Sequence, residues 1–210
     1  FRLCRDFIKC LGIHQSASKL YEADDLIGTW AKILQQQAIN VNIISADKVL
    51  AQLIHEGDHW WEYQRGEKLD KNKITKRFGA NPKQIPDQLA IAGDKSDNIP
   101  GVPGIGMSTA GKLLRKFDNL DNLFANLAEI SSMQIRGAKR IQQLITDHQQ
   151  SIRLSRKLTG IVCDIEDIPL NTFSITAIDE GTFEVLANQL NLSIESQEKW
   201  LNLQRKLQSQ

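Results

Sequence analysis

The chain has 210 residues, 41% of them hydrophobic and 24% charged, the composition of an ordinary globular protein of one domain or of one domain with a small lobe. Its 26 basic and 25 acidic side chains give a formal net charge of +1, so a nucleic-acid-binding surface would have to be a local stripe. No apolar run reaches the roughly 18 residues of a membrane span, and three cysteines without a CxxC pair favour free thiols in a reducing, cytoplasmic setting.

A first group of acidic residues lies where a predicted strand gives way to a helix. Helical spacing predicts a helix over residues 1–11, followed by a strand over 13–18 and an amphipathic helix that ends near residue 37. The first turn of the last helix contains Glu22, Asp24 and Asp25. Acids complement the dipole at a helix N-terminus, but three within four residues exceed that need. Strand-to-helix junctions are also where α/β proteins place their sites.

A second junction of the same kind follows. A β-branched strand over residues 41–45 leads to Asp47 and to a helical pattern that continues through Ile54. Two successive strand–acid–helix units imply parallel strands with right-handed crossovers, so both acidic groups should emerge at one edge of the sheet. Taken alone, Asp47 is equally well explained as the N-cap of the helix after it.

The next segments carry aromatic and basic residues. Residues 59–63 predict a strand whose Trp60 and Trp61 point to opposite faces, one into the core and one to the surface. Base stacking by the outer ring is the alternative. A short basic helix over residues 69–78 is expected to present a solvated face. A helix over residues 84–92 then leads into the most informative part of the chain.

Asp94 and Asp97 form an acidic pair three residues apart, which on a helix or helical turn would share one face. Two carboxylates this close repel each other unless a cation or water separates them, and such oxygen ligands suit Mg²⁺ or Mn²⁺. The alternative is a solvated turn, because the Asp-Asn-Pro-Gly residues of this segment are typical of loops.

A glycine segment over residues 100–106 precedes a helix over residues 108–117. Its glycines allow close backbone approach, and Ser108 or Thr109 is expected to cap the helix, whose free N–H groups and dipole favour phosphate. The alternative is a tight turn without a ligand. The phosphate-binding candidates are Gly101, Gly104, Ile105, Gly106, Met107, Ser108, Thr109 and Lys112. Further helices are expected over residues 120–128, 137–158, 182–190 and 196–207.

Four motifs resemble, in order and spacing, the bacterial 5′-3′ exonuclease and flap endonuclease family, which includes stand-alone enzymes and the 5′-nuclease domain of the repair DNA polymerase. They are YEADDLIG, ISADK, LAIAGDKSDNIPGVPGIG and TAGKLL. The resemblance covers residues 1–164. It implies an α/β fold with a partial PIN-like parallel sheet in residues 1–86, a helix-three-turn-helix (helix-hairpin-helix) subdomain in 87–168, and a C-terminal helical extension in 169–210.

The resemblance also implies the site. Two divalent ions, Mg²⁺ or Mn²⁺, would lie among Glu22, Asp24, Asp25, Asp47, Asp94 and Asp97. Of these, Asp24, Asp25, Asp94 and Asp97 would be catalytic. A K⁺ ion in the hairpin would be bound by the main-chain carbonyls of Ile91, Ala92, Pro100, Val102 and Ile105. The activity implied is hydrolysis of DNA at 5′ ends or flaps during replication and repair, by a monomer in the cytoplasm.

Two departures from the family pattern leave other functions open. Val49 stands where the family has a metal-binding aspartate, and an aspartate-bearing first strand and a basic arch are expected upstream of Phe1. Without them the chain would be a module that binds branched DNA but does not cut it. An RNA-cleaving relative is a third reading, which the hairpin disfavours. No Ser-His-Asp or Cys-His arrangement accompanies the motifs.

Overall fold

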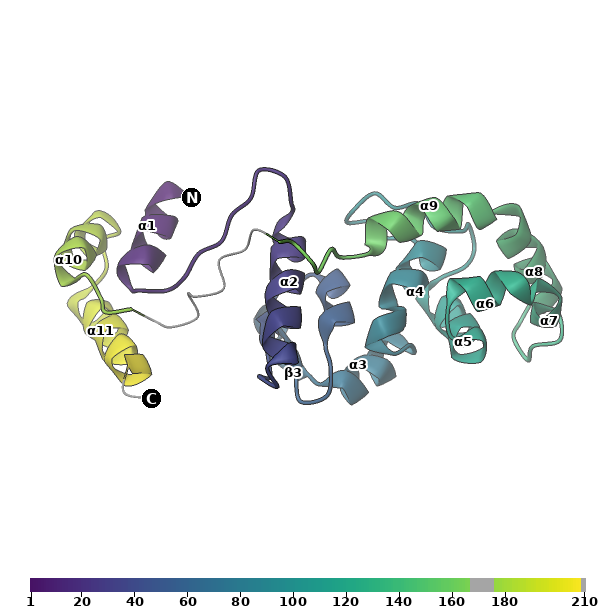
Figure 1. The fold of residues 1–210 in the computed structure, drawn as a ribbon, viewed down its shortest axis with the longest axis horizontal. Helices are drawn as coiled ribbons and strands as arrows, with labels where there is room; N and C mark the ends of the chain where they lie inside the picture. The colour runs from purple at the N-terminus through teal and green to yellow at the C-terminus, as the bar shows by residue number, and fades with distance from the viewer. Residues whose placement is uncertain (167–175, 209–210) are drawn as a thin grey trace. The chain divides into compact units, whose positions relative to one another are not determined.

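The computed structural model describes residues 1–166 and 176–208, and its chain divides into two compact units. One unit is residues Ile27–Asp164, and the other combines Phe1–Leu26 with Ile165–Gln210. Figure 1 shows that helices dominate both units. No helix in the described part of the chain is long and apolar enough to cross a membrane. The predicted domain boundary at residues 168 and 169 falls outside the described residues.

The unit that contains both chain ends is helical. It comprises α1 (Arg2–Cys10), α10 (Glu180–Gln189) and α11 (Ile194–Gln208). Phe7 of α1 packs against Phe183, with 5.6 Å between the ring centroids. The strand predicted over residues 13–18 is wrong, since this segment is an exposed loop. An extended segment becomes a strand only by pairing its backbone groups with a neighbour, and no described residue pairs with it in a ladder.

The larger unit contains a small mixed sheet. Its strands are β1 (Asn42–Ile44), β2 (His59–Glu62) and β3 (Glu67–Leu69), in that order. β1 and β2 are parallel, whereas β2 and β3 form an antiparallel hairpin through η2 (Tyr63–Arg65) and Gly66 at φ 67°. The parallel pair predicted from residues 13–18 and 41–45 is wrong, because residues 13–18 are a loop and β1 pairs with β2 instead. Trp60 is 1% exposed and Trp61 is half-buried on the other face, which confirms the predicted alternation.

Two helical segments pack against the sheet and form a hydrophobic core with it. Helix α2 (Ala23–Gln36) and the 3₁₀ helix η1 (Lys48–Leu53) contribute Ala31, Leu50 and Leu53 to one buried cluster with Ile43 and Trp60. The helical pattern predicted after residue 47 is therefore a tighter 3₁₀ helix.

The rest of this unit is helical. It comprises α3 (Lys71–Phe78), η3 (Pro82–Gln84), α4 (Ile85–Ala92), α5 (Met107–Phe117), α6 (Leu120–Ala125), α7 (Leu127–Ile130), α8 (Ala138–Asp147) and α9 (Gln149–Thr159). The single helix predicted over residues 137–158 is broken at His148. Ile145 of α8 and Ile152 of α9 are both buried in the core of this unit.

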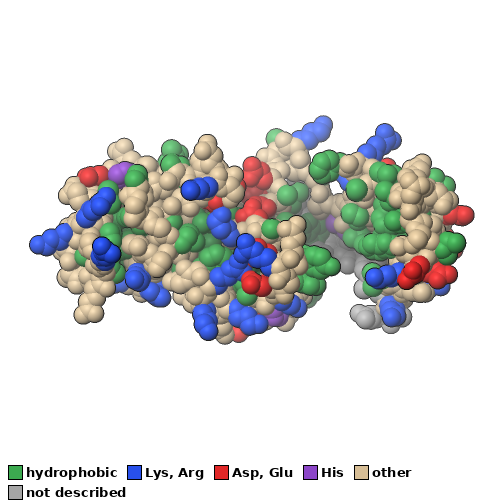
Figure 2. Space-filling model, turned by 180° about the vertical axis from the view of Figure 1, so that it is seen from behind, with side chains coloured by type: hydrophobic (Ala, Val, Ile, Leu, Met, Phe, Trp, Pro, Cys, Tyr) green, Lys and Arg blue, Asp and Glu red, His purple; other side chains and the backbone are tan. Residues whose placement is uncertain are grey.

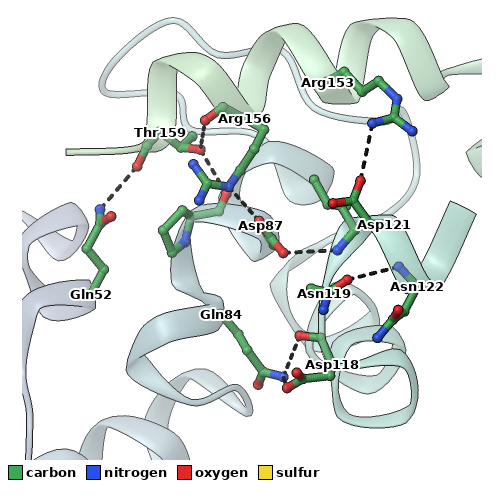
Figure 3. A network of polar contacts seen from close by, with 12 residues as sticks. Gln52, Gln84, Asp87, Asp118, Asn119, Asp121, Asn122, Arg153, Arg156 and Thr159 are labelled. Atoms are coloured by element: carbon green, nitrogen blue, oxygen red, sulfur yellow. Dashed lines mark hydrogen bonds and ion pairs between the residues drawn. The ribbon is translucent and has the colours of Figure 1, made fainter. Parts of the chain in front are cut away.

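Polar side chains fix α4 between its neighbours (Figure 3). The Asp87 carboxylate of α4 accepts from Arg156 Nε of α9 at 2.5 Å and from the Leu120 N–H at 3.0 Å. Gln84, at the start of α4, donates to the carbonyls of Leu114 and Asp118 at 3.0 and 2.9 Å. These contacts hold the helices on either side of the glycine hairpin in a fixed arrangement.

Candidate metal and phosphate site

Asp94 lies one residue beyond α4. The helix ends at Ala92, and Gly93 turns the chain at φ 83°. Asp94 and Ile99 then pair through two backbone hydrogen bonds of 2.9 and 2.7 Å, around a turn in which Asn98 has φ 57°. Asp94 and Asp97 therefore lie on a tight turn, not on the predicted helix or helical turn. A left-handed residue suits such a turn and would interrupt a helix.

The two oxygens of the Asp94 carboxylate have different surroundings. Oδ1 accepts from Lys48 Nζ at 2.6 Å, Ser96 Oγ at 2.5 Å and the Ser96 N–H at 3.1 Å. Oδ2 is buried and accepts a hydrogen bond from none of the described residues. Burial acts to raise the pKa of Asp94, but the hydrogen bonds from Lys48 and Ser96 and the charge of Lys48 outweigh it, so that the pKa lies below its ordinary value. Asp94 is thus an ionised carboxylate with one unused oxygen.

Asp97 is exposed on the same turn. Its pKa is raised, first by partial desolvation and then by the negative charges of Asp94 and Asp47, with Lys48 acting in the opposite direction. The negative charges of Asp94 and Asp47 thus both act on Asp97. A cation beside Asp97 would offset this repulsion.

Asp47 caps η1. Its carboxylate accepts from the Val49 N–H at 2.8 Å, and its own N–H donates to Ser45 Oγ at 3.0 Å. The N-cap interpretation of Asp47 is therefore confirmed, while its charge also reaches Asp97. Val49 is 8% exposed and packs into the core of the sheet, so this position contributes no ligand.

Glu22, Asp24 and Asp25 belong to the other unit, whose N-terminal segment ends at Leu26. Asp24 and Asp25 occupy the first turn of α2, and the Glu22 N–H donates to Asp25 Oδ2 at 3.2 Å. Their convergence with Asp47, at the second junction of strand and helix, stays a prediction. Among the described residues, no group of three or more His, Cys, Asp or Glu side chains has the arrangement of a metal site.

The glycine hairpin folds back onto the end of α4. Gly101 has φ 61°, and a Cβ there would lie 2.3 Å from Gly93 N and 2.4 Å from Ala92 C, which explains why the position requires glycine. The Val102 N–H donates to Ile91 O at 2.8 Å, and the side chain of Val102 is buried. The hairpin and the Asp94 turn are therefore packed backbone to backbone.

The outer part of the hairpin is open. A Cβ at Gly104 or Gly106 would meet no atom of the other described residues within 4 Å, and both glycines are exposed. Gly106 is the N-cap of α5, which corrects the expectation that Ser108 or Thr109 caps the helix. The N–H groups of the first turn of an α-helix have no partner within the helix. Lys112 is exposed on the following turn.

The carbonyl groups predicted to bind K⁺ lie on α4 and the hairpin. Those of Ile91 and Val102 each accept one backbone hydrogen bond, of 2.8 and 3.0 Å. A carbonyl oxygen has two lone pairs, so these bonds leave each oxygen able to contact an ion. The carbonyls of Ala92, Pro100 and Ile105 complete the predicted set, which stays a prediction.

Sequence reasoning missed Lys48 and Ser96 as parts of the site. Both contact Asp94, Lys48 from 46 residues away. The signal was available, because each lies between acids already singled out, in Asp47-Lys48 and in Asp94-Lys95-Ser96-Asp97. On the face in view, Figure 2 shows Lys and Arg side chains among acidic and neutral ones.

Solved structures identify the fold. The chain resembles the catalytic core of Rad2 in complex with DNA substrate, with a TM-score of 0.63 and 17% identity over 97% of this chain and 68% of that one. It also resembles a T5 5′-exonuclease with bound zinc, with a TM-score of 0.59 and 16% identity over 93% of this chain and 63% of that one. At such identities the likeness shows the fold alone, a PIN-like α/β part followed by helices.

Curated relatives are more similar in sequence. A 5′-3′ exonuclease of Buchnera aphidicola subsp. Schizaphis graminum is 38% identical over 168 residues, which are 80% of this chain and 58% of that protein. DNA polymerase I of Bacillus caldotenax is 36% identical over 165 residues, 77% of this chain and 18% of that protein. The chain spans about six-tenths of the length of the Buchnera exonucleases that it matches.

Two family models match successive parts of the chain. The first, "5′-3′ exonuclease, N-terminal resolvase-like domain", matches residues 1–79, and the second, "5′-3′ exonuclease, C-terminal SAM fold", matches residues 80–181. The first match contains Asp47 and the second contains Asp94, Asp97 and the glycine hairpin. The chain therefore belongs to the 5′-3′ exonuclease family.

Proposed function

We propose that this chain is part of a structure-specific 5′-nuclease, which hydrolyses phosphodiester bonds at DNA 5′ ends or flaps in replication and repair. The observation that carries the proposal is that one loop contains both elements of such a site. The loop begins with Asp94, whose Oδ2 is buried and unpartnered among the described residues, and ends with the open turn at Gly104 and Gly106. The loop thus offers a ligand for a cation and a turn that a phosphate can approach.

The residues present fit a divalent cation. Asp94 offers its unused oxygen, and Asp47 and Asp97 add negative charge beside it. Glu22, Asp24 and Asp25 would complete the ligand set. Oxygen donors of this kind suit Mg²⁺ or Mn²⁺, and one T5 5′-exonuclease was crystallised with divalent zinc. When bound, two such ions supply a water of lowered pKa and stabilise the leaving oxygen.

The chain's own residues prepare the site. Lys48 and Ser96 hold Asp94 in its ionised form and in one orientation. Asp97 is exposed, and the negative charges of its neighbours repel its carboxylate. This carboxylate is therefore available to a cation or to a water molecule near the substrate. Carboxylates repel a phosphodiester, and they need a cation between them and the substrate for chemistry.

The hairpin binds the duplex part of the substrate. The N–H groups at the start of α5 and the positive end of its dipole attract a phosphate, and the open turn leaves room for a DNA backbone. A K⁺ ion held by the carbonyls of Ile91, Ala92, Pro100, Val102 and Ile105 would add positive charge there. Since these groups contact only phosphate, binding should be insensitive to base sequence. The protein would act as a cytoplasmic monomer.

A double substitution tests this function in the full-length protein. Asp94→Ala with Asp97→Ala should abolish cleavage of a fluorescent 5′-flap DNA but leave flap binding largely intact, because both acids serve the chemistry. Asp121→Ala with Asp147→Ala removes two exposed acids of α6 and α8 and is the control for charge. Cleavage at the wild-type rate by the Asp94/Asp97 variant would refute the proposal.

A second candidate, a branched-DNA-binding module without catalysis, is favoured by one observation. Val49 is buried where the family resemblance expects an acidic ligand, and Lys48 already neutralises Asp94. The same assay separates the two candidates, because the module would bind the flap tightly while its wild-type form showed no turnover with Mg²⁺ or Mn²⁺.

A further inference from the structure

Lys48 is a cation built into the acidic cluster. Its Nζ lies 2.6 Å from Asp94 Oδ1 and 3.3 Å from Ser96 Oγ. The Asp94 side chain is 2% exposed and that of Lys48 is 32% exposed, so this ion pair is better shielded than a surface pair. A buried carboxylate needs such a partner to remain charged.

The backbone around Lys48 is fixed, which makes its placement a property of the fold. Lys48 is the first residue of η1, whose N-cap Asp47 accepts the Val49 N–H at 2.8 Å. Val49 and Leu50 follow immediately and are buried in the sheet core. From this backbone position Lys48 contacts Asp94 at Oδ1.

Negative charges outnumber positive ones in this neighbourhood. Asp47 and Asp97 add carboxylates beside Asp94, and Lys48 adds a positive charge. Asp94 Oδ2, a buried oxygen that accepts no hydrogen bond from any described residue, lies on the same carboxylate as the oxygen that Lys48 contacts.

We propose that Lys48 is the resident cation of this cluster, which pairs with Asp94 Oδ1 and leaves Oδ2 as the oxygen of this carboxylate that a divalent ion would contact. The inference rests on the proposed function. It makes Lys48 a positioning residue that fixes the Asp94 carboxylate and that weakens, by repulsion between like charges, the affinity of the cluster for a divalent ion.

The test is Mn²⁺ binding by the full chain without DNA, measured from the electron paramagnetic resonance signal of free Mn²⁺, together with thermal unfolding. Lys48→Met should bind Mn²⁺ about tenfold more tightly, a change of about 1.4 kcal/mol, and should unfold at a lower temperature without metal. Lys48→Arg, which retains the charge, should bind Mn²⁺ as the wild type does. Lys95→Met removes a lysine from the exposed turn next to Asp94 and is the matched control.

A double-mutant cycle assigns the effect to Asp94. In an Asp94→Asn background, Lys48→Met should no longer change Mn²⁺ affinity, because the charge pair is already broken. Weaker Mn²⁺ binding by Lys48→Met, or an effect equal to that of Lys95→Met, would overturn the role of Lys48 while leaving the metal site standing. If neither the wild type nor Lys48→Met bound Mn²⁺, the proposed metal chemistry itself would fail, and this inference with it.

Discussion

Gly106 provides the most direct test of backbone contact with DNA. Its φ of −97° and ψ of 176° are accessible to any residue, and an added Cβ would lie more than 4 Å from the atoms of the other residues that the structure describes. Gly106→Ala and Gly106→Ser should therefore fold normally, but both should obstruct a DNA backbone that approaches α5. A hydrogen bond to a charged group is worth about 1.5–3 kcal/mol, so the loss of one phosphate contact should weaken flap binding about 10- to 100-fold.

The two substitutions have opposite effects on stability, which separates folding from binding. Gly106 is the N-cap of α5, where serine stabilises a helix and alanine destabilises it, with a difference of about 1 kcal/mol. Thermal unfolding should thus rank Gly106→Ser above Gly106→Ala. Fluorescence anisotropy with a 5′-flap duplex should show a similar loss of affinity in both variants.

Gly181→Ala is the control for adding a methyl group to an open glycine. Gly181 lies in α10 of the other unit, where the nearest atom to an added Cβ is 3.8 Å away. This variant should bind DNA as the wild type does. Wild-type affinity in both Gly106 variants would refute the hairpin as the DNA contact, and a loss in Gly106→Ala alone would show that helix capping, not backbone approach, matters.

Three further predictions follow from the same structure. Asp97→Asn should raise thermal stability at pH 7 by less than about 1 kcal/mol, since the group is exposed and screened. Because the folded-state pKa of Asp97 is raised above 3.8, ionisation of this carboxyl group lowers the stability of the folded protein as pH rises through that pKa. Equal stability of the wild type and Asp97→Asn at neutral pH would contradict the repulsion between Asp97 and its acidic neighbours. Arg156→Met should lower the free energy of unfolding in urea by about 2 kcal/mol, because it leaves the carboxylate of Asp87 with one backbone donor. Arg153→Met, which breaks an exposed pair, should cost under about 1 kcal/mol, and similar losses in both variants would argue against a special role for the Asp87 pair. Replacing K⁺ by Li⁺ at constant ionic strength should weaken flap binding beyond the general salt effect, and equal affinities in the two salts would remove the ion from the hairpin.

Local signals in the sequence predicted the hairpin subdomain well. The spacing of apolar residues after Ser108 locates α5, and the glycines of the hairpin mark its turn, because both features depend only on neighbouring residues. The cap of α5 was assigned two residues too late, since Ser108 and Thr109 are better capping residues than Gly106. The buried side chains of Val102 and Ile105 anchor the turn, and the helix begins directly after it.

The errors concern features that depend on distant partners. The strand predicted over residues 13–18 had an acceptable composition, but a strand exists only with a neighbour, and the sequence does not show which segment that would be. The acidic pair was expected on a helical face from its spacing, whereas the pairing of Asp94 with Ile99 imposes a turn. The break at His148 likewise depends on where the helical core lies.

The polar surroundings of Asp94 show most clearly what spacing alone cannot predict. From the sequence, Val49 is only a position where a metal ligand is missing, and Lys48 is only a charged residue between Asp47 and Val49. The structure gives each a role, because burial of Val49 anchors the chain that carries Lys48 to Asp94. Val49 thus supplies no carboxylate, but its packing explains why Lys48, the residue before it, contributes its charge beside Asp94. The composition of this acidic cluster is therefore better described by its charge balance than by its number of aspartates.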